Sequence, residues 1–321
     1  MGDINVLLVN STFGRLASGS GQHVYMLWKH LKDKVNFEVW NVESVGYIDI
    51  PKLKSISFLL KAKRKKIPKD IDIIHIHNPK FAALFREGKK NVLTMHGDYK
   101  VELEVQYGPL AKPIIHYIDE NLKRANIITT VSPYWSKLRG WVWIPNMVEL
   151  SEIGKISPSG EEYVLFVGRD DPVKNYPLFR NIAEETYKTL GLKSLALGIV
   201  RGDTEFLRHA KVPWEVVISY MKSAVVLVIT SKQEGLPTVL LEAWASGCPV
   251  LAYDIPPMRC LNDMYGTPLI FNNARELVEM ISKLSETKEE LVKRGLEAVK
   301  NFDVPKVVEQ YYDLYRNLIE R

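Results

Sequence analysis

The most constraining feature of the chain is an apolar run that is followed by a tight turn and a second apolar segment of helical character. The run AVVLVI (224–229) is uninterrupted, which is typical of a strand buried on both faces of a parallel sheet. Gly235 and Pro237 then break the pattern, and Thr238 begins a helical stretch that ends at Gly247. The sequence therefore predicts a strand–turn–helix unit.

Two glutamates, Glu234 and Glu242, frame this unit. Glu234 follows the predicted strand and so lies at the carboxyl edge of a sheet, where open α/β sheets bind ligands. The amides of the first helical turn are free to hold an anion. Glu242 lies within VLLEAWA, where an unpaired charge is costly. This arrangement suits a polyhydroxylated ligand joined to a phosphate, and the alternative is that both glutamates are ordinary solvated residues.

Two cations follow another predicted strand, YVLFV (163–167). Arg169 comes after Gly168 at the end of this strand, and Lys174 follows five residues later, just before a predicted helix. A guanidinium can bind two phosphate oxygens at once, while an ammonium acts as a point charge, so the pair suits a diphosphate. The alternative is a charged turn in which arginine and aspartate neutralise one another.

Strand and helix signals alternate along the chain, which indicates parallel sheets covered by helices. We expect an α/β fold with two Rossmann-like domains, over residues 1–148 and 162–303, that face each other across a central cleft. The polar segment 149–161 carries Gly, Pro and Ser and indicates a linker. The last residues, 304–321, are expected to be a helix and are a candidate to cross back to the first domain.

The segments around Arg169 and Glu234 together resemble the signature of the retaining GT-B-fold glycosyltransferases of family four, the glycosyl transferases group 1. The family pattern is E-G-(F/L)-(P/G)-x-x-x-x-E-A-x-A-x-G-x-P-V, which Glu234 to Val250 follow almost residue for residue. A G-R-x-x-x-x-K element opens the carboxyl-terminal domain of the family, as Gly168 to Lys174 do here. The resemblance implies a GT-B enzyme that moves a sugar from a nucleotide diphosphate donor to an acceptor with retention.

The resemblance also implies roles for individual residues. Arg169 and Lys174 would stabilise the departing diphosphate, in place of a metal. Glu234 would orient the donor sugar and Glu242 would hold the ribose. Further donor contacts would come from the turn and first helical residues, namely Gly235, Leu236, Thr238 and Val239.

The first half of the chain matches the family more loosely. Gly19 and Gly21 precede a helix at the place of a family glycine pair, and His96 ends the strand NVLTM where a family histidine reaches the donor sugar. Ser132 and Asn146 match positions that line the cleft. Structural alternatives stand beside these roles, since a glycine loop is often a plain turn and a histidine at a strand end is often a packed residue.

Other motifs argue against a metal and leave the donor open. His75 and His77 share one face of a strand without a third ligand, so a supporting role fits them better than a metal pair. The D-x-D at Asp70 and Asp72 precedes a strand instead of following one, so we expect no essential metal and no cofactor. Residues 254–258 (DIPPM) replace a family glycine pair, and prolines cannot donate hydrogen bonds. The donor is therefore left as a UDP-, GDP- or ADP-sugar.

Charge is concentrated in the first half. Residues 1–150 hold 22 Lys+Arg against 14 Asp+Glu, a net of +8, while residues 151–321 hold 21 against 24, a net of −3. The densest cluster, KAKRKK (61–66), follows an apolar stripe at helical spacing. We predict that the segment from Lys52 to Lys66 is a basic amphipathic helix that docks on an anionic membrane. The alternative is a helix packed on its own sheet with a solvated outer face.

Composition narrows the class of protein. A hydrophobic content of 46% and a charged content of 25% are those of a soluble globular protein, and no apolar run nears the roughly 18 residues of a membrane span. Two cysteines without metal-type spacing favour a reducing compartment, so we expect a cytoplasmic protein, with peripheral attachment to the membrane as an option. The sequence has no zinc-finger spacing or aromatic-interleaved basic strand, which argues against nucleic acid as a partner.

The acceptor is left open between a lipid-linked and a soluble glycan. Two rival functions also remain at this point. The first is a nucleotide-sugar epimerase or a phosphorylase of the same architecture, the latter with a pyridoxal cofactor. The second is a sugar-nucleotide-binding protein or membrane-surface scaffold without turnover.

Overall fold

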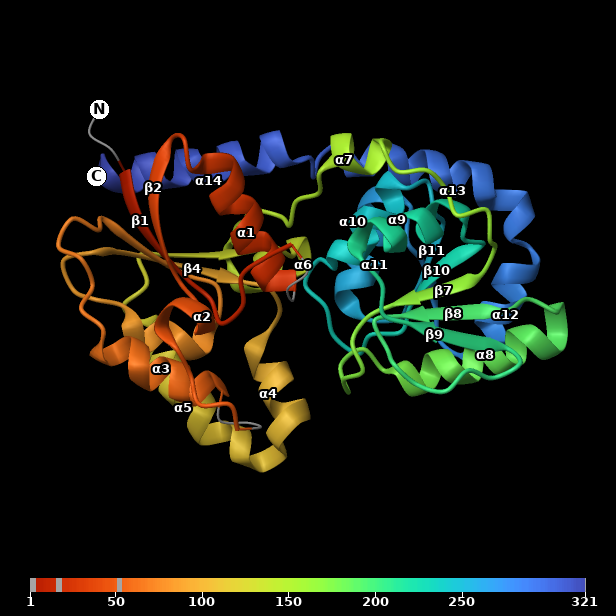
Figure 1. Cartoon of the computed structure of the whole chain (residues 1–321), viewed down its shortest axis with the longest axis horizontal. Helices are drawn as coiled ribbons and strands as arrows, with labels where there is room; N and C mark the ends of the chain where they lie inside the picture. Colours follow the sequence, from red (N-terminus) through yellow and green to blue (C-terminus); the bar gives the residue numbers. More distant parts are fainter. Residues whose placement is uncertain (1–3, 16–18, 51–53, 321) are drawn as a thin grey trace. The chain divides into compact units, whose positions relative to one another are not determined.

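The computed structural model describes residues 4–15, 19–50 and 54–320. The chain divides into two compact units, which are unit 1 (Met1–Met147 with Val304–Arg321) and unit 2 (Val148–Asp303). Each unit contains one six-stranded sheet with helices against it (Figure 1). All pairs of neighbouring strands are parallel. The predicted α/β fold with two Rossmann-like domains is confirmed in this respect.

The sheet of unit 1 has the order β2-β1-β3-β4-β5-β6. The order reverses at β1, which pairs with β2 on one side and β3 on the other. Its strands are short, and four of them lie within the apolar runs of the sequence. The strands are β1 (Ile4–Val9), β2 (Val35–Trp40), β3 (Ile73–Ile76), β4 (Lys90–Met95), β5 (Ile127–Thr130) and β6 (Val142–Trp143).

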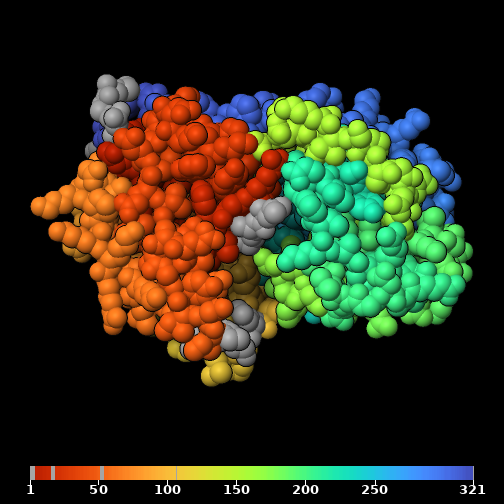
Figure 2. Space-filling model, in the orientation of Figure 1, coloured from red at the N-terminus to blue at the C-terminus, as the bar shows by residue number. Residues whose placement is uncertain are grey.

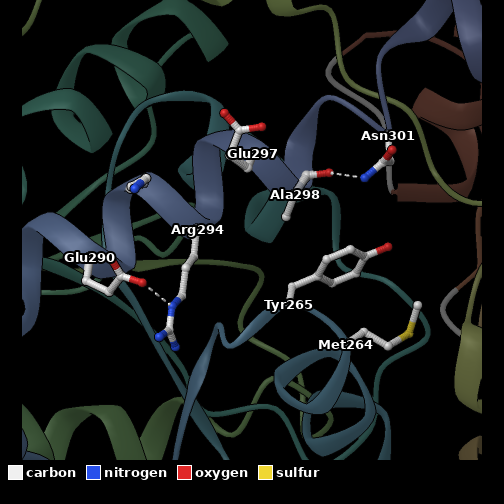
Figure 3. Close-up of a pocket in the computed structure, with 8 residues that line it drawn as sticks. Met264, Tyr265, Glu290, Arg294, Glu297, Ala298 and Asn301 are labelled. Atoms are coloured by element: carbon white, nitrogen blue, oxygen red, sulfur yellow. Dashed lines mark hydrogen bonds and ion pairs between the residues drawn. The ribbon is translucent and has the colours of Figure 1, made fainter.

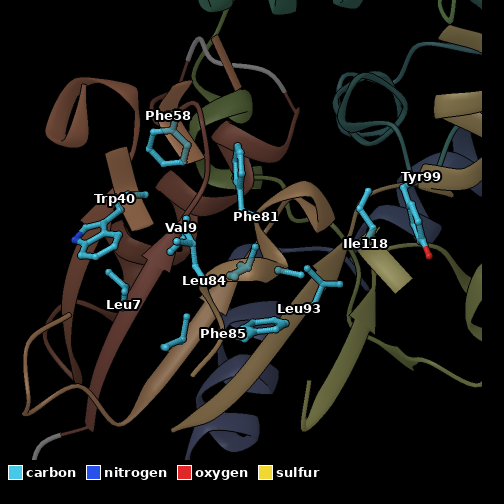
Figure 4. Packing of buried hydrophobic residues seen from close by; sticks show 14 of the residues in the cluster. Leu7, Val9, Trp40, Phe58, Phe81, Leu84, Phe85, Leu93, Tyr99 and Ile118 are labelled. Atoms are coloured by element: carbon cyan, nitrogen blue, oxygen red, sulfur yellow. The ribbon is translucent and has the colours of Figure 1, made fainter. Parts of the chain in front are cut away.

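Two hydrophobic clusters cover the two faces of this sheet. Successive side chains of a strand point to opposite faces, so Leu7 and Val9 pack in one cluster, and Val6 and Leu8 pack in the other. The first cluster includes large side chains of the covering segments, among them Phe58 (Figure 4). The elements on this face are α2 (Val42–Val45), α3 (Lys54–Arg64), η1 (Pro79–Leu84), α4 (Tyr99–Tyr107), η2 (Gly108–Leu110) and α5 (Ala111–Leu122).

The opposite face of the unit 1 sheet is covered by helices from both ends of the chain. Helix α1 (Gly19–Leu31) packs beside α14 (Val304–Ile319). In α14 the buried residues Val307, Tyr311 and Tyr315 recur every four residues and form one apolar face. The last residues of the chain are therefore part of the core of unit 1. One more helix, α6 (Pro133–Arg139), connects β5 to β6.

The sheet of unit 2 has the order β12-β11-β10-β7-β8-β9. The chain builds outward from β7 to β9 and then returns to the other side of β7 with β10, so the order reverses between β7 and β10. These two strands are paired at the centre of the sheet. The strands are β7 (Val164–Val167), β8 (Ser194–Leu197), β9 (Leu207–Ala210), β10 (Val226–Ile229), β11 (Val250–Tyr253) and β12 (Leu269–Phe271).

The helices of unit 2 are partly those that the sequence predicts. The strand–turn–helix unit is present as β10 and α10, whereas β9 and α11 were not predicted. The helices are α7 (Leu150–Gly154), α8 (Tyr176–Leu190), α9 (Trp214–Ser223), α10 (Thr238–Ala245), α11 (Pro256–Tyr265), α12 (Ala274–Ser282) and α13 (Leu284–Val299). Among the described residues, no helix has the length and hydropathy needed to cross a bilayer.

The segment 149–161 differs from the predicted linker. Its first part forms helix α7, which contacts α10 within unit 2. The reason is Ile153, which is buried within the polar segment, and composition alone hides such a single anchor. The remainder is tied to α9, because Ser219 Oγ donates to the carbonyl of Ser157 at 2.8 Å.

Candidate active site

The carboxyl ends of β7 and β10 bring together the strongest predicted residues of unit 2. Lys174 lies in the loop after β7, and Glu234 lies in the loop after β10. Lys174 Nζ is 2.6 Å from Glu234 Oε1, and the two side chains are 23% and 10% exposed. This ion pair therefore lies at the topological switch point of the sheet, where open α/β sheets bind their ligands.

The loop that carries Lys174 is held by hydrogen bonds on both sides. Asp171 Oδ1 accepts from the backbone amides of Val173 and Lys174, both at 3.0 Å. Thr230, at the end of β10, donates its hydroxyl to the carbonyl of Lys174 at 2.8 Å. Asn175 follows with a positive φ of 52° and leads into α8. These bonds hold the backbone of Lys174 in place, so the fold fixes the point from which its side chain extends.

Arg169 also lies at this edge, but its side chain has an acidic neighbour. Its Nε donates to Asp171 Oδ2 at 3.1 Å, and a second guanidinium nitrogen lies 3.0 Å from the same oxygen. The side chain is 66% exposed. Both predicted cations thus stand at the carboxyl edge, and Arg169 in addition makes the arginine–aspartate contact of a charged turn.

Glu242 lies on α10 and is 5% exposed. Its Oε1 accepts a hydrogen bond from Trp214 Nε1 of α9 at 2.8 Å. The costly burial of this charge is thus compensated by a directed donor. Sequence reasoning did not identify Trp214, because α9 and α10 are separate elements whose contact only the fold reveals.

The turn before α10 is mostly buried, and the helix start is partly open. Gly235 and Leu236 are buried, whereas Thr238 and Val239 are partly exposed in the first turn. The residue that precedes the helix is Pro237, whose side chain offers no oxygen to cap the first amides. The first turn of α10 therefore has no side-chain cap, and the anion site expected there stays a prediction.

Two glycines meet at the ends of β7 and β8. A Cβ atom on Gly198 would lie 2.5 Å from the carbonyl oxygen of Gly168, and Gly198 has a φ of +93°. The two strand ends therefore approach more closely than any other residue allows. The sequence motif marks Gly168 but not Gly198.

The proline-containing segment after β11 has a structural explanation. Pro256 and Pro257 occupy the first turn of α11, where a missing amide hydrogen costs no helical bond. Asp254 is paired with Arg259 of the same helix at 2.5 Å. The two prolines thus begin a helix at the place where the family commonly has a glycine pair.

In unit 1, four histidines gather at the carboxyl edge. His77 follows β3, His96 follows β4 and His23 comes from α1. His77 Nδ1 and His96 Nε2 are 3.3 Å apart, and the rings of His23 and His96 have centroids 5.1 Å apart. The fourth, His75, stacks on His77 with centroids 4.1 Å apart. The predicted residue His96 is thus part of an imidazole cluster.

A hydrogen-bond chain continues from this cluster to Asn146 and α14. Asn146 Oδ1 can only accept, so His23 donates from Nδ1 at 2.8 Å, and its Nε2 accepts from the Tyr311 hydroxyl at 3.1 Å. His75 Nδ1 is 2.7 Å from the Tyr315 hydroxyl, and its Nε2 is 2.7 Å from the Thr94 hydroxyl. His23 and Tyr311 were missed in the sequence because 288 residues separate them.

Burial keeps these imidazoles neutral. It lowers the pKa of His23 to about 4, although the bond with Asn146 acts in the opposite direction. Burial also lowers the pKa of His75, His77 and His96 well below the usual range, and the neighbouring imidazoles add to this shift. At neutral pH the cluster therefore carries hydrogen-bonding groups and no charge.

The remaining predicted residues of unit 1 have structural positions at the same edge. Gly19 begins α1, and Gly21 is buried in its first turn. Ser132 is fully buried and caps α6, with its Oγ accepting from the amide of Trp135 at 3.5 Å. Ser132 therefore serves at least as a helix cap.

Metal-type residues are not grouped in the described part of the chain. No set of three or more His, Cys, Asp or Glu side chains there could hold an ion. Asp72 of the D-x-D precedes β3, and its Oδ2 accepts from the amide of Asn5 at 2.9 Å. This bond joins the start of β3 to β1, which is a structural use of the carboxylate.

A further cavity in unit 2, of about 440 Å³, contains none of the predicted residues. It lies between the end of α11 and α13, and Tyr265 and Met264 line one side (Figure 3). On the other side Arg294 Nε donates to Glu290 at 2.8 Å, so these two charges are paired with each other (Figure 3). This cavity offers no feature that argues for a ligand.

Comparison with known proteins agrees with the fold. Residues 185–300 match the family described as glycosyl transferases group 1, a stretch that includes Glu234 and Glu242 and begins after Lys174. A comparison with curated protein sequences found no match.

Solved structures match along nearly the whole chain. Sucrose-phosphate synthase from Thermosynechococcus elongatus has a TM-score of 0.80 and 18% identity, with 99% of each chain covered. HepE of Anabaena, in complex with UDP-glucose, has a TM-score of 0.73 and 13% identity over 98% of this chain and 100% of that one. An E. coli structure described as trehalose-6-phosphate bound with UDP-2-fluoro glucose has a TM-score of 0.69 and 13% identity, over 97% and 98%.

The family match and the fold lead to the same conclusion. The matched stretch contains the two glutamates that frame α10, and the similarity in fold extends over both units. Residues 185–300 are thus similar to the glycosyl transferases group 1, and the chain as a whole has the GT-B fold.

Proposed function

We propose that this protein transfers a sugar from a nucleoside diphosphate sugar to an acceptor, and that the donor binds at the switch point of unit 2. The observation that carries the proposal is the Lys174–Glu234 ion pair of 2.6 Å at the ends of β7 and β10. A cation for the diphosphate and a carboxylate for sugar hydroxyls stand side by side there. The open first turn of α10 adds backbone donors.

The reaction proposed is a substitution with retention at the anomeric carbon. The bond between this carbon and the β-phosphate oxygen breaks, and the acceptor oxygen bonds to the same face of the carbon. The acceptor proton passes to the departing phosphate oxygen. Lys174, with Arg169 once its guanidinium turns from Asp171 to the phosphates, would stabilise the charge that grows on the leaving group. This step needs no metal and no other cofactor.

The two glutamates would have different tasks because their environments differ. Glu234 is near the exposed edge, where it would accept hydrogen bonds from sugar hydroxyls. Glu242 is buried and held by Trp214, so it offers a fixed acceptor for the ribose hydroxyls. Gly235, Leu236, Thr238 and Val239 would contact the donor through the turn and the helix start. A donor-sugar contact of His96 stays a prediction from the family resemblance.

A uridine diphosphate sugar is the donor that we propose to test first. Several structures of similar fold are described as complexes with UDP or UDP-glucose. The acceptor is proposed to be a glycan, either lipid-linked or soluble. The protein would act in the cytoplasm, with peripheral attachment to an anionic membrane as a further proposal.

A thermal-shift screen with UDP-, GDP- and ADP-sugars tests the proposal. A bound donor at 100 times its dissociation constant stabilises the folded state by roughly 2.7 kcal/mol. We expect one nucleotide class to raise the melting temperature and its sugar to be released or transferred on incubation. Lys174→Ala should lose the shift, whereas Lys188→Ala, which removes an exposed lysine of α8, should keep it. Binding without sugar release with any acceptor would favour a non-catalytic protein.

A further inference from the structure

Unit 1 has a basic hollow of about 470 Å³ that the proposed reaction does not use. It lies where α3 ends and where the chain enters β3 and β4. The segments 63–69 and 86–89 line it with seven Lys or Arg residues and one Glu. Figure 2 shows long side chains of this part of the chain, in orange, standing out from unit 1.

The charge of this region is unusual within its own unit. Residues 54–90 hold 11 Lys+Arg and 3 Asp+Glu, a net of +8. The other residues of the first 150 hold 11 Lys+Arg and 11 Asp+Glu, so their net charge is zero. The whole positive excess of the first half is therefore concentrated around the hollow. Such a field attracts a polyanionic partner.

Some of these cations are engaged within the protein and others are available. Lys65 lies 3.4 Å from Glu38, and Lys89 donates to the carbonyls of Lys69 and Ile71. Lys63 donates to the Tyr117 hydroxyl at 3.1 Å. Within the part of the chain that the structure describes, three other exposed cations of the hollow have neither an acidic partner nor a side-chain hydrogen bond. These are Arg64, Lys66 and Lys69.

Helix α3 adds an exposed apolar face next to these cations. Phe58 and Ala62 are fully buried and fasten the helix to the sheet, while Ile56 and Leu60 are 56% and 55% exposed. Ile56 and Leu60 are four residues apart and share a helix face with Arg64. The predicted amphipathic helix is thus present, but its apolar stripe is divided between core and solvent. Lys52 and Leu53, at its predicted start, lie outside the described residues.

The loop before α3 enlarges this face. Ile48 and Ile50 are half exposed, and the amide of Ile48 donates to Ser57 Oγ of α3 at 2.9 Å. Single exposed apolar side chains are ordinary. The four branched aliphatic side chains lie on this loop and on α3, and Arg64 continues the exposed row of Ile56 and Leu60 toward the hollow.

We propose that an anionic lipid surface binds here, with Arg64, Lys66 and Lys69 against the headgroups and Ile56 and Leu60 at the acyl boundary. Aliphatic side chains next to lysines suit a bilayer interface, and base stacking would call for aromatic ones. The docking surface excludes His77 and His96, which lie at the opposite, carboxyl ends of β3 and β4. Lipid binding itself does not depend on the proposed function. Only its purpose does, which is to bring the enzyme to a membrane-borne glycan.

Vesicle co-sedimentation tests this docking surface. We expect the full chain to bind vesicles of phosphatidylcholine with phosphatidylglycerol, but not vesicles of phosphatidylcholine alone. The binding should weaken between about 0.1 M and about 1 M salt, where the screening length falls from about 10 Å to about 3 Å. Replacement of Arg64, Lys66 and Lys69 by Gln should weaken it about a hundredfold, since each cation contributes about a fivefold change.

A charge-matched control separates local from overall electrostatics. The triple change to Gln of Lys188, Lys283 and Lys300, all exposed in unit 2, removes the same charge and should leave vesicle binding unchanged. The pair Ile56→Ser and Leu60→Ser should weaken vesicle binding without creating a cavity, since both side chains are more than half exposed.

Three results would overturn the proposal. The first is a lack of binding of wild type to anionic vesicles at low salt. The second is equal vesicle binding by the two triple variants. The third is full competition of inorganic phosphate with the vesicles, together with vesicle binding by the Ser variant that equals that of wild type. This result would identify a site for phosphate alone. Retention of the donor-induced thermal shift in all variants shows that they fold. If wild type binds vesicles but gives no donor-induced shift, only the proposed function is contradicted.

Discussion

Trp214 of α9 donates its indole N–H to the carboxylate of Glu242 on α10 at 2.8 Å. This bond fixes the position of a buried acidic side chain. It also explains why an apolar helix tolerates a glutamate at this position. If Glu242 holds the ribose of the donor, Trp214 positions the group that binds it.

The exchange Trp214→Phe should therefore weaken donor binding about tenfold or somewhat more, since a hydrogen bond to a charged group contributes about 1.5–3 kcal/mol. The turnover number at saturating donor should change less. Trp244→Phe is the matched control, because it also removes an indole hydrogen bond, but one to Thr267 and not to Glu242. Calorimetric titration with the donor distinguishes the two, and equal losses of affinity would refute the positioning role of Trp214.

A second prediction concerns the contact of Gly198 with Gly168. The change Gly198→Ala places a Cβ atom 2.5 Å from a carbonyl oxygen at a positive φ, so it should destabilise unit 2 by about 2–4 kcal/mol. Gly202→Ala has open space and an ordinary φ, and should change stability by less than about 1 kcal/mol. Urea unfolding measures both variants. Equal stabilities would show that the strand ends can separate without cost.

Acid should destabilise unit 1 through its buried histidines. The folded-state pKa of His23, about 4, lies below its unfolded value near 6.5, so the unfolded state binds more protons as pH falls. The stabilising contribution is complete above pH 6.5 and is lost as pH falls toward about 4. Between pH 7 and pH 5, His23 alone should lower the free energy of unfolding by about 2 kcal/mol.

Urea unfolding at pH 7 and pH 5 checks this sign and size. His23→Gln should reduce the pH dependence by that amount, whereas His30→Gln, at an exposed position of α1, should leave it as in wild type. A pH dependence that His23→Gln does not alter would mean that His23 is protonated in the folded state at pH 5.

Chelation should leave sugar transfer intact. Arg169 and Lys174 are proposed to neutralise the leaving diphosphate, which is the task of a metal elsewhere. Sugar release or transfer measured with excess EDTA should therefore stay within about twofold of the untreated rate. A complete loss that magnesium restores would contradict this assignment and would reopen the role of Asp70 and Asp72.

The central elements of unit 2 were predictable because their signals are local. An apolar run, a break at Gly235 and a helical segment suffice to predict β10 and α10. The positions of Arg169, Lys174 and Glu234 after apolar runs predict that these residues lie at strand ends. The structure then joined Lys174 to Glu234 across 60 residues, which the sequence did not indicate.

Other features depend on contacts that no local pattern encodes. The bond between His23 and Tyr311 exists because α14 packs beside α1. The close approach of Gly198 to the Gly168 carbonyl depends on how two loops meet. Helix α7 was missed because its one buried anchor, Ile153, is set among polar residues. The exposed half of the α3 stripe was also unpredictable, since periodicity does not tell which apolar side chains reach the core.

Turnover of the Lys174→Ala variant tests the central claim most directly. If Lys174 stabilises the leaving diphosphate, the variant should release or transfer sugar at least about a hundredfold more slowly than wild type, the effect of removing one preorganised charge stabiliser. The fold should be retained, because Lys174 lies in a loop and is partly exposed. Near-normal turnover in Lys174→Ala, and in the double variant with Arg169→Ala, would contradict the placement of the donor diphosphate at this edge of unit 2.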